Sequence, residues 1–353
     1  MNSYLSDVKA KERKNELLKT FEKMISYAVE EDVYGIIIAG DLFDKKNISS
    51  TARNTVMNAV VNNPSLQFYY LRGNHDNTGF WGDLVVLPDN LHIFTEEWTR
   101  YTLFENNGRK ITLNGVELDD DNSSLIYEGL VLDATDYNIV ILHGQESANT
   151  KKGAAIINLK ELRNRYIDYL ALGHIHSYKE EQLDARGVYC YSGCLEGRGF
   201  DECGEHGFVL LNIDEENFKC TREFVAFAGR KLYEVEVDIS GCMDSLEIAD
   251  TIGAVIENCC YNRNNLIKII LTGNVAVECD INLEFLSKKF EDEFYYVRIK
   301  DESGIEIDFE AYAYDESLKG EFVRLVREDN SLTDEDKKIV IRYGILALRG
   351  EEI

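Results

Sequence analysis

Histidine, aspartate and asparagine recur in this sequence directly after short apolar runs, where their side chains could hold a metal ion. Four of the 6 histidines lie in such places, in segments that also contain glycine. A metal centre needs neutral imidazoles and oxygen ligands that rigid elements aim at one point. The mixture of imidazole and hard oxygen ligands suits Mn, Fe or Zn better than Ca. The predicted metal ligands are Asp41, Asn74, His143, His174 and His176.

The remaining histidine of this set, His75, is predicted to act as a general acid rather than as a ligand. Asp44 follows Asp41 by one turn, so Asp41 can ligate a metal while Asp44 hydrogen-bonds His75. A histidine held beside a metal in this way could protonate a leaving alkoxide oxygen. Asp41 could also bridge two ions, and two ions ~3.5–4 Å apart are the usual arrangement for displacement at phosphorus. A single histidine is more often a core or loop residue, but the coincidence of four favours a functional site.

The segments before these residues alternate between helical and strand-like patterns. Apolar residues at helical spacing predict helices over 12–31 and 49–62. Continuous apolar runs predict strands over 33–39, 66–72, 137–142 and 168–172, followed by short strands near 188–191 and 207–213. In open α/β sheets, sites form beyond the carboxyl ends of the strands. The sequence therefore predicts an α/β domain that carries its site at that edge.

Two further regions depart from this alternation. Residues 91–120 contain short runs that predict an antiparallel component, with hairpin turns at Asn106-Asn107-Gly108 and Asn114-Gly115. From about residue 231 the predicted order is strand, helix, strand, helix, strand and two helices. The predicted domains are 1–230, which carries every candidate site residue, and 231–353, a smaller α/β accessory or capping domain.

The composition limits the class of protein. The chain has 38 basic and 64 acidic side chains and a formal charge of −26, which excludes a purely basic nucleic-acid binder. No apolar run approaches the ~20 residues of a membrane span, and the polar N-terminus is not a signal peptide. We therefore expect a cytoplasmic protein without a membrane partner, whose 8 cysteines are reduced. The set Cys190, Cys194, Cys203 and His206 matches no common zinc spacing, so the three cysteines are predicted to be ordinary buried thiols and His206 to lie on the surface.

Four motifs, in this order, resemble the calcineurin-like metallophosphoesterase superfamily: GDLFD, GNHD, LHG and GHIH. The later segment YSGCLEGRGFDECGEHGF resembles the bacterial DNA-repair exonuclease branch, the SbcD-like and YhaO-like proteins. The resemblance implies a two-sheet α/β/β/α metallophosphoesterase sandwich with a dinuclear site at the carboxyl ends of the strands. It also implies a DNA substrate, a coiled-coil ATPase partner subunit and a homodimer.

The resemblance also implies a role for each candidate residue. Asp41 would bridge two divalent ions, with Mn as the predicted metal and Fe or Zn as alternatives. Asn74, His143 and His174 would complete one site, and His176 would contribute to the other. His75 would be the catalytic histidine and Asp44 its hydrogen-bonding partner.

One family motif is missing from this sequence. The family begins with a strand that ends in Asp-x-His and supplies two ligands to the ion that His176 binds. The nearest candidate, Asp7-Val8-Lys9, lacks the histidine. We therefore expect one complete site, one incomplete site and impaired activity. A chain truncated at its start, or a true loss of the strand, would each explain the difference.

The leading functional hypothesis is a metal-dependent phosphodiesterase, a nuclease of the DNA-repair exonuclease type that uses metal-activated water. The first alternative keeps the chemistry and changes the substrate, as in a Ser/Thr phosphatase or a small-molecule phosphomonoesterase. The second alternative is a catalytically impaired binding or scaffold subunit, because the Asp-x-His motif is absent. Arg198 lies in a glycine-rich stretch, where contact with a substrate phosphate and a solvated surface position are equally compatible with the sequence.

Overall fold

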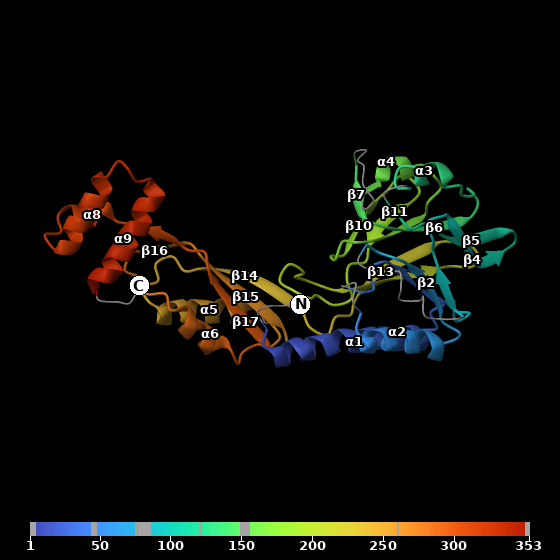
Figure 1. The fold of residues 1–353 in the computed structure, drawn as a ribbon, viewed down its shortest axis with the longest axis horizontal. Coiled ribbons are helices and arrows are strands. Elements are labelled where there is room, and N and C mark those ends of the chain that lie inside the picture. Colours follow the sequence, from blue (N-terminus) through green and yellow to red (C-terminus); the bar gives the residue numbers. More distant parts are fainter. Residues whose placement is uncertain are drawn as a thin grey trace. The chain divides into compact units, whose positions relative to one another are not determined.

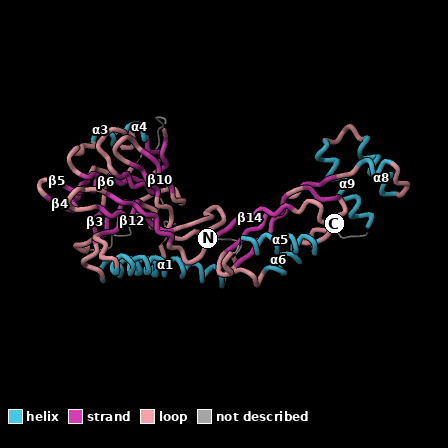
Figure 2. The backbone as a smooth tube through the Cα atoms, turned by 180° about the vertical axis from the view of Figure 1, so that it is seen from behind, coloured by secondary structure: helices cyan, strands magenta, loops and turns pink. Residues whose placement is uncertain are grey.

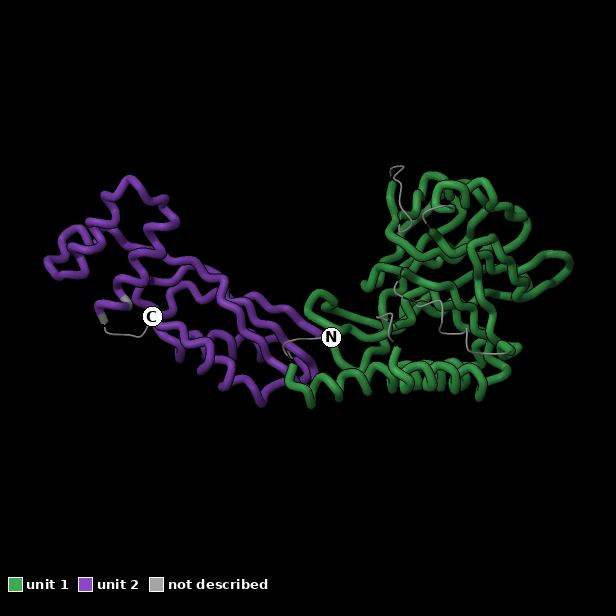
Figure 3. Tube along the Cα trace, viewed as in Figure 1, with its two compact units in different colours: residues 1–231 green, residues 232–353 purple. Residues whose placement is uncertain are grey.

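The computed structural model describes residues 5–43, 48–74, 76, 86–119, 122–148, 156–259 and 261–349. The chain divides into two units, residues 1–231 and 232–353, which Figure 3 shows in different colours. Each unit has its own sheets and its own core, and each is described by itself. No helix in the described part of the chain is both long and apolar enough to cross a bilayer.

Two sheets form the body of the first unit (Figure 1). The smaller sheet has three parallel strands in the order β1-β2-β3, namely β1 (Gly35–Ala39), β2 (Gln67–Leu71) and β3 (Leu91–Ile93). The larger sheet has the order β10-β11-β9-β6-β5-β4. Its strands are β4 (Thr99–Asn106), β5 (Arg109–Gly115), β6 (Tyr137–His143), β9 (Tyr169–Gly173), β10 (Lys179–Gln182) and β11 (Val188–Tyr191). Two-stranded ribbons are formed by β7 (Gln145–Ser147) with β8 (Ile156–Asn158), and by β12 (Gly207–Ile213) with β13 (Cys220–Ala226).

Alternate side chains of the strands point to different layers, as the period of a strand requires. Tyr69 and Leu71 of β2 pack with Ile139 and Ile141 of β6 in one core between the two sheets. The intervening Tyr70 of β2 faces the other way, into the core under the helices. The two sheets are therefore stacked face to face.

Helices cover the outer face of each sheet. Helix α1 (Asp7–Glu30) and helix α2 (Ser50–Asn62) share a core with the small sheet, whereas the short helices α3 (Ile126–Gly129) and α4 (Leu159–Leu162) share one with the large sheet. The resulting order of layers is helix, sheet, sheet, helix. This order confirms the predicted α/β/β/α sandwich.

Local signals explain where helix α1 begins and ends. The hydroxyl of Ser6 accepts a hydrogen bond from the backbone N–H of Lys9 at 3.4 Å, so the helix begins before the predicted residue 12. Phe21, Ile25 and Ala28 form its buried stripe. Beyond the helix, Asp32 has a φ of 52°, a left-handed conformation that turns the chain toward β1.

One of the two predicted hairpin turns is confirmed and the other is wrong. β4 and β5 are antiparallel, and Asn107 and Gly108 between them have φ values of 51° and 81°, as a tight hairpin turn requires. Asn114 and Gly115 are instead the last residues of β5 and are paired with β6. The Nδ2 of Asn114 donates to the carbonyl of Ile139 at 3.2 Å, so this dipeptide lies within the sheet and does not form a turn.

The second unit begins with the predicted alternation of strands and helices (Figure 2). Its three-stranded parallel sheet contains β14 (Leu232–Asp238), β15 (Leu266–Thr272) and β17 (Tyr296–Asp301). Helices α5 (Ser245–Cys259) and α6 (Leu283–Phe290) share a core with this sheet. A second small core lies among β18 (Gly304–Glu306), α7 (Phe309–Ala313), α8 (Leu318–Glu328) and α9 (Asp334–Arg349), and β18 pairs with β16 (Asn274–Ala276). The sequence did not predict β16, β18 or α7.

Candidate metal centre

The ends of strands from both sheets of the first unit carry the predicted ligands. Asp41 follows β1 after a single glycine, and His143 is the last residue of β6. His174 directly follows β9, whose last residue, Gly173, is paired with His143. One ligand atom from each of these three residues lies within 4.8 Å of the others.

Asn74 completes this group from the loop after β2. Its Oδ1 lies 2.9 Å from Nε2 of His143 and 3.2 Å from Nδ1 of His174. A carboxylate oxygen of Asp41 lies 3.3 Å from the same Nε2 of His143. Two ring nitrogens and two oxygens, from the carboxyl ends of four strands, therefore face a common point.

The backbone fixes which nitrogen of His143 faces this point. Its Nδ1 lies 2.8 Å from the carbonyl oxygen of Ala39, which can only accept a hydrogen bond. Nδ1 therefore carries a proton, and Nε2 is the ring nitrogen that faces Asp41 and Asn74. Burial alone would lower the pKa of His143, but hydrogen bonding to Asp41, the charge of Asp41 and the Ala39 carbonyl together raise it above its ordinary value.

Two glycines permit the close approach of these strand ends. A Cβ on Gly40, whose φ is 88°, would lie 2.3 Å from Nδ1 of His143. A Cβ on Gly173 would lie 1.6 Å from the carbonyl oxygen of Ala39. Any larger residue at either position would separate His143 from the carbonyl that orients it.

Two of the grouped residues have positive φ angles, a backbone conformation that residues other than glycine rarely adopt. Asp41 has a φ of 52° and His174 a φ of 102°. Such conformations each cost on the order of 1–3 kcal/mol and persist only where the surroundings impose them. Their occurrence at two of these four residues agrees with a functional site.

Asp76 fastens together the loops that carry Asp41 and Asn74. Its Oδ1 accepts the backbone N–H of Phe43 at 3.0 Å, and its Oδ2 accepts those of Leu42 at 3.3 Å and Gly73 at 3.0 Å. Asp76 had no predicted role. The only sequence signal was its place two residues after Asn74, since the contacts themselves depend on the tertiary fold.

An ion pair and a tyrosine hydroxyl fix the segments that follow His143 and His176. The carboxylate of Glu146 lies 2.6 Å from Nζ of Lys179. The buried hydroxyl of Tyr191 donates to the carbonyl of Gly144 and accepts the N–H of Glu146, both at 2.8 Å. The positions of the two loops are therefore fixed relative to each other by one ion pair and one tyrosine.

His176 is not part of the group formed by Asp41, His143 and His174. Its Nδ1 lies 2.7 Å from Oε1 of Glu202 and 2.9 Å from Nη2 of Arg198. Its role as a metal ligand stays a prediction. Glu202 had no predicted role. Its side chain is buried, which raises its pKa, but the contacts with Arg198 and the charge of His176 outweigh burial, so the pKa lies below its ordinary value.

The predicted surface position of His206 is wrong, and so is the predicted burial of Cys203, which is exposed. The side chain of His206 is buried, with Nε2 2.9 Å from the carbonyl of Glu202 and Nδ1 3.3 Å from Sγ of Cys194. Burial, together with the charge of Glu202, raises the pKa of the Cys194 thiol to about 12, so without a metal the thiol is neutral. The predicted catalytic residues His75 and Asp44 lie outside the described residues.

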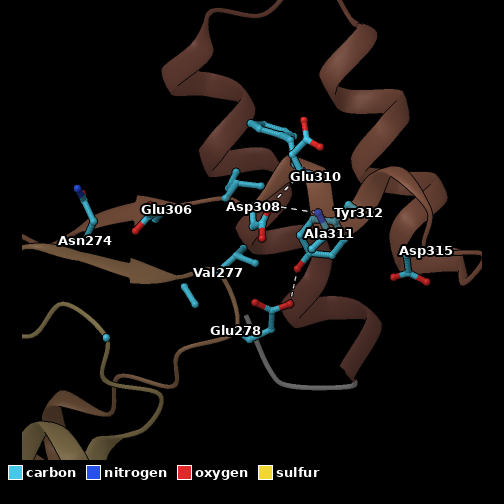
Figure 4. A pocket seen from close by; sticks show the side chains of 13 residues that line it. Asn274, Val277, Glu278, Glu306, Asp308, Glu310, Ala311, Tyr312 and Asp315 are labelled. Carbon is cyan, nitrogen blue, oxygen red and sulfur yellow. Dashed lines mark hydrogen bonds between the residues drawn. The ribbon is translucent and has the colours of Figure 1, made fainter.

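A pocket of about 850 Å³ lies elsewhere, in the second unit (Figure 4). Its acidic lining residues are Glu278, Glu306, Asp308, Glu310 and Asp315. Glu278 is paired with Lys319, and Asp308 caps helix α7 by accepting the N–H of Glu310 at 3.0 Å. None of the predicted site residues lines this pocket.

Comparison with known proteins identifies the class of the first unit. Residues 5–178 match the family described as calcineurin-like phosphoesterase. This segment is therefore a calcineurin-like metallophosphoesterase domain, as its motifs predicted. A metal-dependent domain of this kind agrees with the grouping of Asp41, His143 and His174.

Individual relatives are more distant. The chain is 30% identical over 201 residues to the metallophosphoesterase YhaO of Bacillus subtilis (strain 168), over 54% of this chain and 48% of that protein. It is 22% identical over 289 residues to the DNA double-strand break repair protein Mre11 of Sulfolobus acidocaldarius, over 76% of this chain and 72% of that protein. A solved structure, TT1561 of Thermus thermophilus, is 14% identical, with a TM-score of 0.39 over 59% of this chain and 93% of its own. The chain thus spans about half the length of YhaO.

Proposed function

We propose that the first unit is a metal-dependent phosphodiesterase of the DNA-repair nuclease type. The observation that carries the proposal is the convergence of Asp41, His143 and His174, with ligand atoms within 4.8 Å of one another. The Mre11 relative, named as a DNA double-strand break repair protein, supports DNA as the substrate class. The match to the phosphoesterase family supports the hydrolysis of a phosphoester bond.

The donor set fits a divalent cation. With the proton on Nδ1, Nε2 of His143 is an acceptor, and Oδ1 of Asn74 and the carboxylate of Asp41 near it are acceptors too. Acceptors this close repel one another unless a proton or a cation lies among them. Imidazole nitrogen combined with carboxylate and amide oxygen suits Mn²⁺, which we propose as the metal, with Fe and Zn as alternatives.

The chain's own residues would do the following work. Asp41, Asn74, His143 and His174 would hold the ion, and Ala39 keeps His143 in the required tautomer. A divalent ion at this point supplies stabilisation of negative charge on a phosphoryl group. His75, with Asp44 as its hydrogen-bonding partner, is proposed to donate a proton to the leaving oxygen. Residues 232–353 are proposed as an accessory unit.

Binding of DNA by this acidic chain is expected to need basic surface from a partner. DNA binding depends on lysine and arginine that neutralise phosphates, and this chain has a net charge of −26. We propose that a partner supplies part of the basic surface, and a coiled-coil ATPase subunit is the candidate that the resemblance implies. The homodimer and the impaired activity expected from the missing Asp-x-His motif stay predictions.

The test compares Mn²⁺-dependent hydrolysis of bis-p-nitrophenyl phosphate, a diester, with that of p-nitrophenyl phosphate, a monoester. We expect diester turnover that His143→Asn abolishes. His92→Asn is the matched control, because His92 lies on β3 and contacts Gln67 rather than the metal ligands. Faster turnover of the monoester would favour a phosphomonoesterase. No turnover of either ester with bound Mn²⁺ would favour a binding or scaffold subunit.

A further inference from the structure

His176 has a different environment from the other predicted ligands. Nε2 of His143 faces the oxygens of Asp41 and Asn74, whereas His176 lies against a cation and a carboxylate. Nη2 of Arg198 is 2.9 Å from its Nδ1 and 3.4 Å from its Nε2, and Oε1 of Glu202 is 2.7 Å from its Nδ1. A positive charge of the chain itself therefore already lies beside this imidazole.

Glu202 holds the guanidinium of Arg198 in this position. Its Oε1 accepts from Nη2 of Arg198 at 2.7 Å and from Nε at 3.1 Å. Its Oε2 accepts the backbone N–H of Arg198 at 2.7 Å. The carboxylate side chain of Glu202 is only 6% exposed, and Arg198 is 22% exposed. A buried carboxylate that binds both the side chain and the backbone of one arginine leaves that arginine little freedom.

In either neutral tautomer of His176, the ring nitrogen that carries the lone pair, and could therefore bind a metal, lies near the guanidinium of Arg198. If Nδ1 carries the proton, it donates to Glu202, and the lone pair is on Nε2, 3.4 Å from Nη2 of Arg198. If Nε2 carries the proton, the lone pair is on Nδ1, 2.9 Å from the same Nη2. An ion bound to either nitrogen would lie ~2 Å from it and would face a like charge at short range.

We propose that the guanidinium of Arg198 takes the place of a second cation at His176, so that the centre binds one divalent ion and Arg198 supplies the second positive charge beside the substrate phosphate. The proposal rests on the proposed phosphoesterase function for its substrate. It rests on the contacts of His176 for the number of ions. A guanidinium suits this role because its planar donors match the oxygens of a phosphoryl group and its charge does not titrate near neutral pH.

The test counts Mn²⁺ ions bound by the intact chain, with isothermal titration calorimetry and with EPR of free Mn²⁺. We expect one ion for the natural chain and for Arg198→Lys, which keeps a positive charge. Arg198→Met removes the charge and leaves His176 and Glu202 to bind a second, weaker ion. Adding His176→Asn to that variant should return the count to one.

Arg222→Met is the matched control. Arg222 also pairs with a single glutamate, with its Nε 3.1 Å and its Nη2 3.2 Å from the carboxylate of Glu180, but it lies on β13 away from the metal ligands. Its loss should leave the count at one. Thermal unfolding of each variant shows whether it is folded. Two ions in the natural chain, or one ion in a folded Arg198→Met variant, would overturn the proposal.

Turnover gives a second readout that separates this inference from the proposed function. With Mn²⁺ sufficient for the first ion only, Arg198→Met should lower diester hydrolysis about 100-fold. Excess Mn²⁺ should restore part of the loss, because a second ion would replace the missing charge. If the natural chain binds one ion but hydrolyses nothing, the proposed function fails while the ion count still supports Arg198 as the second cation.

Discussion

Arg13 and Glu196 are 183 residues apart in the sequence, yet Nη2 of Arg13 lies 3.1 Å from Oε2 of Glu196 in the interior of the first unit. Their side chains are only 3% and 2% exposed. The other oxygen of Glu196 accepts from the hydroxyl of Thr20 at 2.8 Å, and Arg13 also donates to the carbonyl of Gly197 at 2.8 Å. Helix α1 thus holds in place the segment that immediately precedes Arg198.

Glu196→Gln should lower the free energy of unfolding of the first unit by about 1–3 kcal/mol, because it leaves the buried guanidinium of Arg13 with one carboxylate partner, Glu16 at 2.6 Å, instead of two. Urea unfolding followed by circular dichroism measures the change. The control is Glu105→Gln, which breaks the exposed pair with Lys110 and should cost less than about 1 kcal/mol. Equal losses in the two variants would mean that the buried pair adds nothing specific.

Asp76→Asn should weaken Mn²⁺ binding about 10- to 100-fold, since one carboxylate positions the loops of both Asp41 and Asn74. Calorimetric titration of the metal-free protein gives the affinity. Asp184 is the matched control, because its carboxylate also accepts three backbone N–H groups, from Asn164, Arg186 and Gly187, in a different loop. If Asp184→Asn weakens Mn²⁺ binding as much as Asp76→Asn, the effect is general destabilisation.

Glu146 should make the stability of the first unit depend on pH in the acid range. Burial raises the pKa of Glu146, but its polar contacts, chiefly the hydrogen bond from Lys179, outweigh burial and lower the pKa below its ordinary value of 4.5. A lowered pKa in the folded state means that the contribution is present above pH 4.5 and is lost as the pH falls through the folded value. Glu146→Gln should therefore be less stable by about 1 kcal/mol at about pH 7 and no less stable near pH 3. Parallel stability profiles for the two proteins over this range would contradict the assignment.

Gly173→Ala and Gly253→Ala should change stability in opposite directions. The new methyl at Gly173 would overlap the carbonyl of Ala39, so we expect a loss of about 2 kcal/mol or more and weaker Mn²⁺ binding. Gly253 lies inside helix α5 with nothing within 4 Å of the added Cβ, and alanine there should stabilise the second unit by about 0.5–1 kcal/mol. Thermal unfolding of both variants tests the pair. An unchanged melting temperature for Gly173→Ala would contradict the close contact.

The sequence predicted the grouping of Asp41, Asn74, His143 and His174 because one simple rule connects it to the fold. Parallel strands end at the same edge of a sheet, so polar residues that follow several apolar runs come together there. The same apolar runs predicted the strands, and the observed β1, β2, β6 and β9 lie within two residues of the predicted bounds.

Other features depended on contacts that no local pattern contains. Glu202 and Asp76 gain their roles from partners brought close by the tertiary fold, and His206 is buried by the same packing. The Asn114-Gly115 prediction was wrong because the dipeptide signals a turn only when the chain reverses there. In this protein β5 continues through it and pairs with β6.

The positive φ angles of Asp41 and His174 imply a trade-off between durability and activity. Glycine adopts these backbone conformations without a steric penalty, so replacing His174 by glycine would relieve strain while it removes a proposed metal ligand. A laboratory selection for heat resistance alone would therefore tend to erase these two side chains first. Their persistence would require a simultaneous selection for catalysis, which makes the pair a sensitive marker of whether a descendant sequence still works as an enzyme.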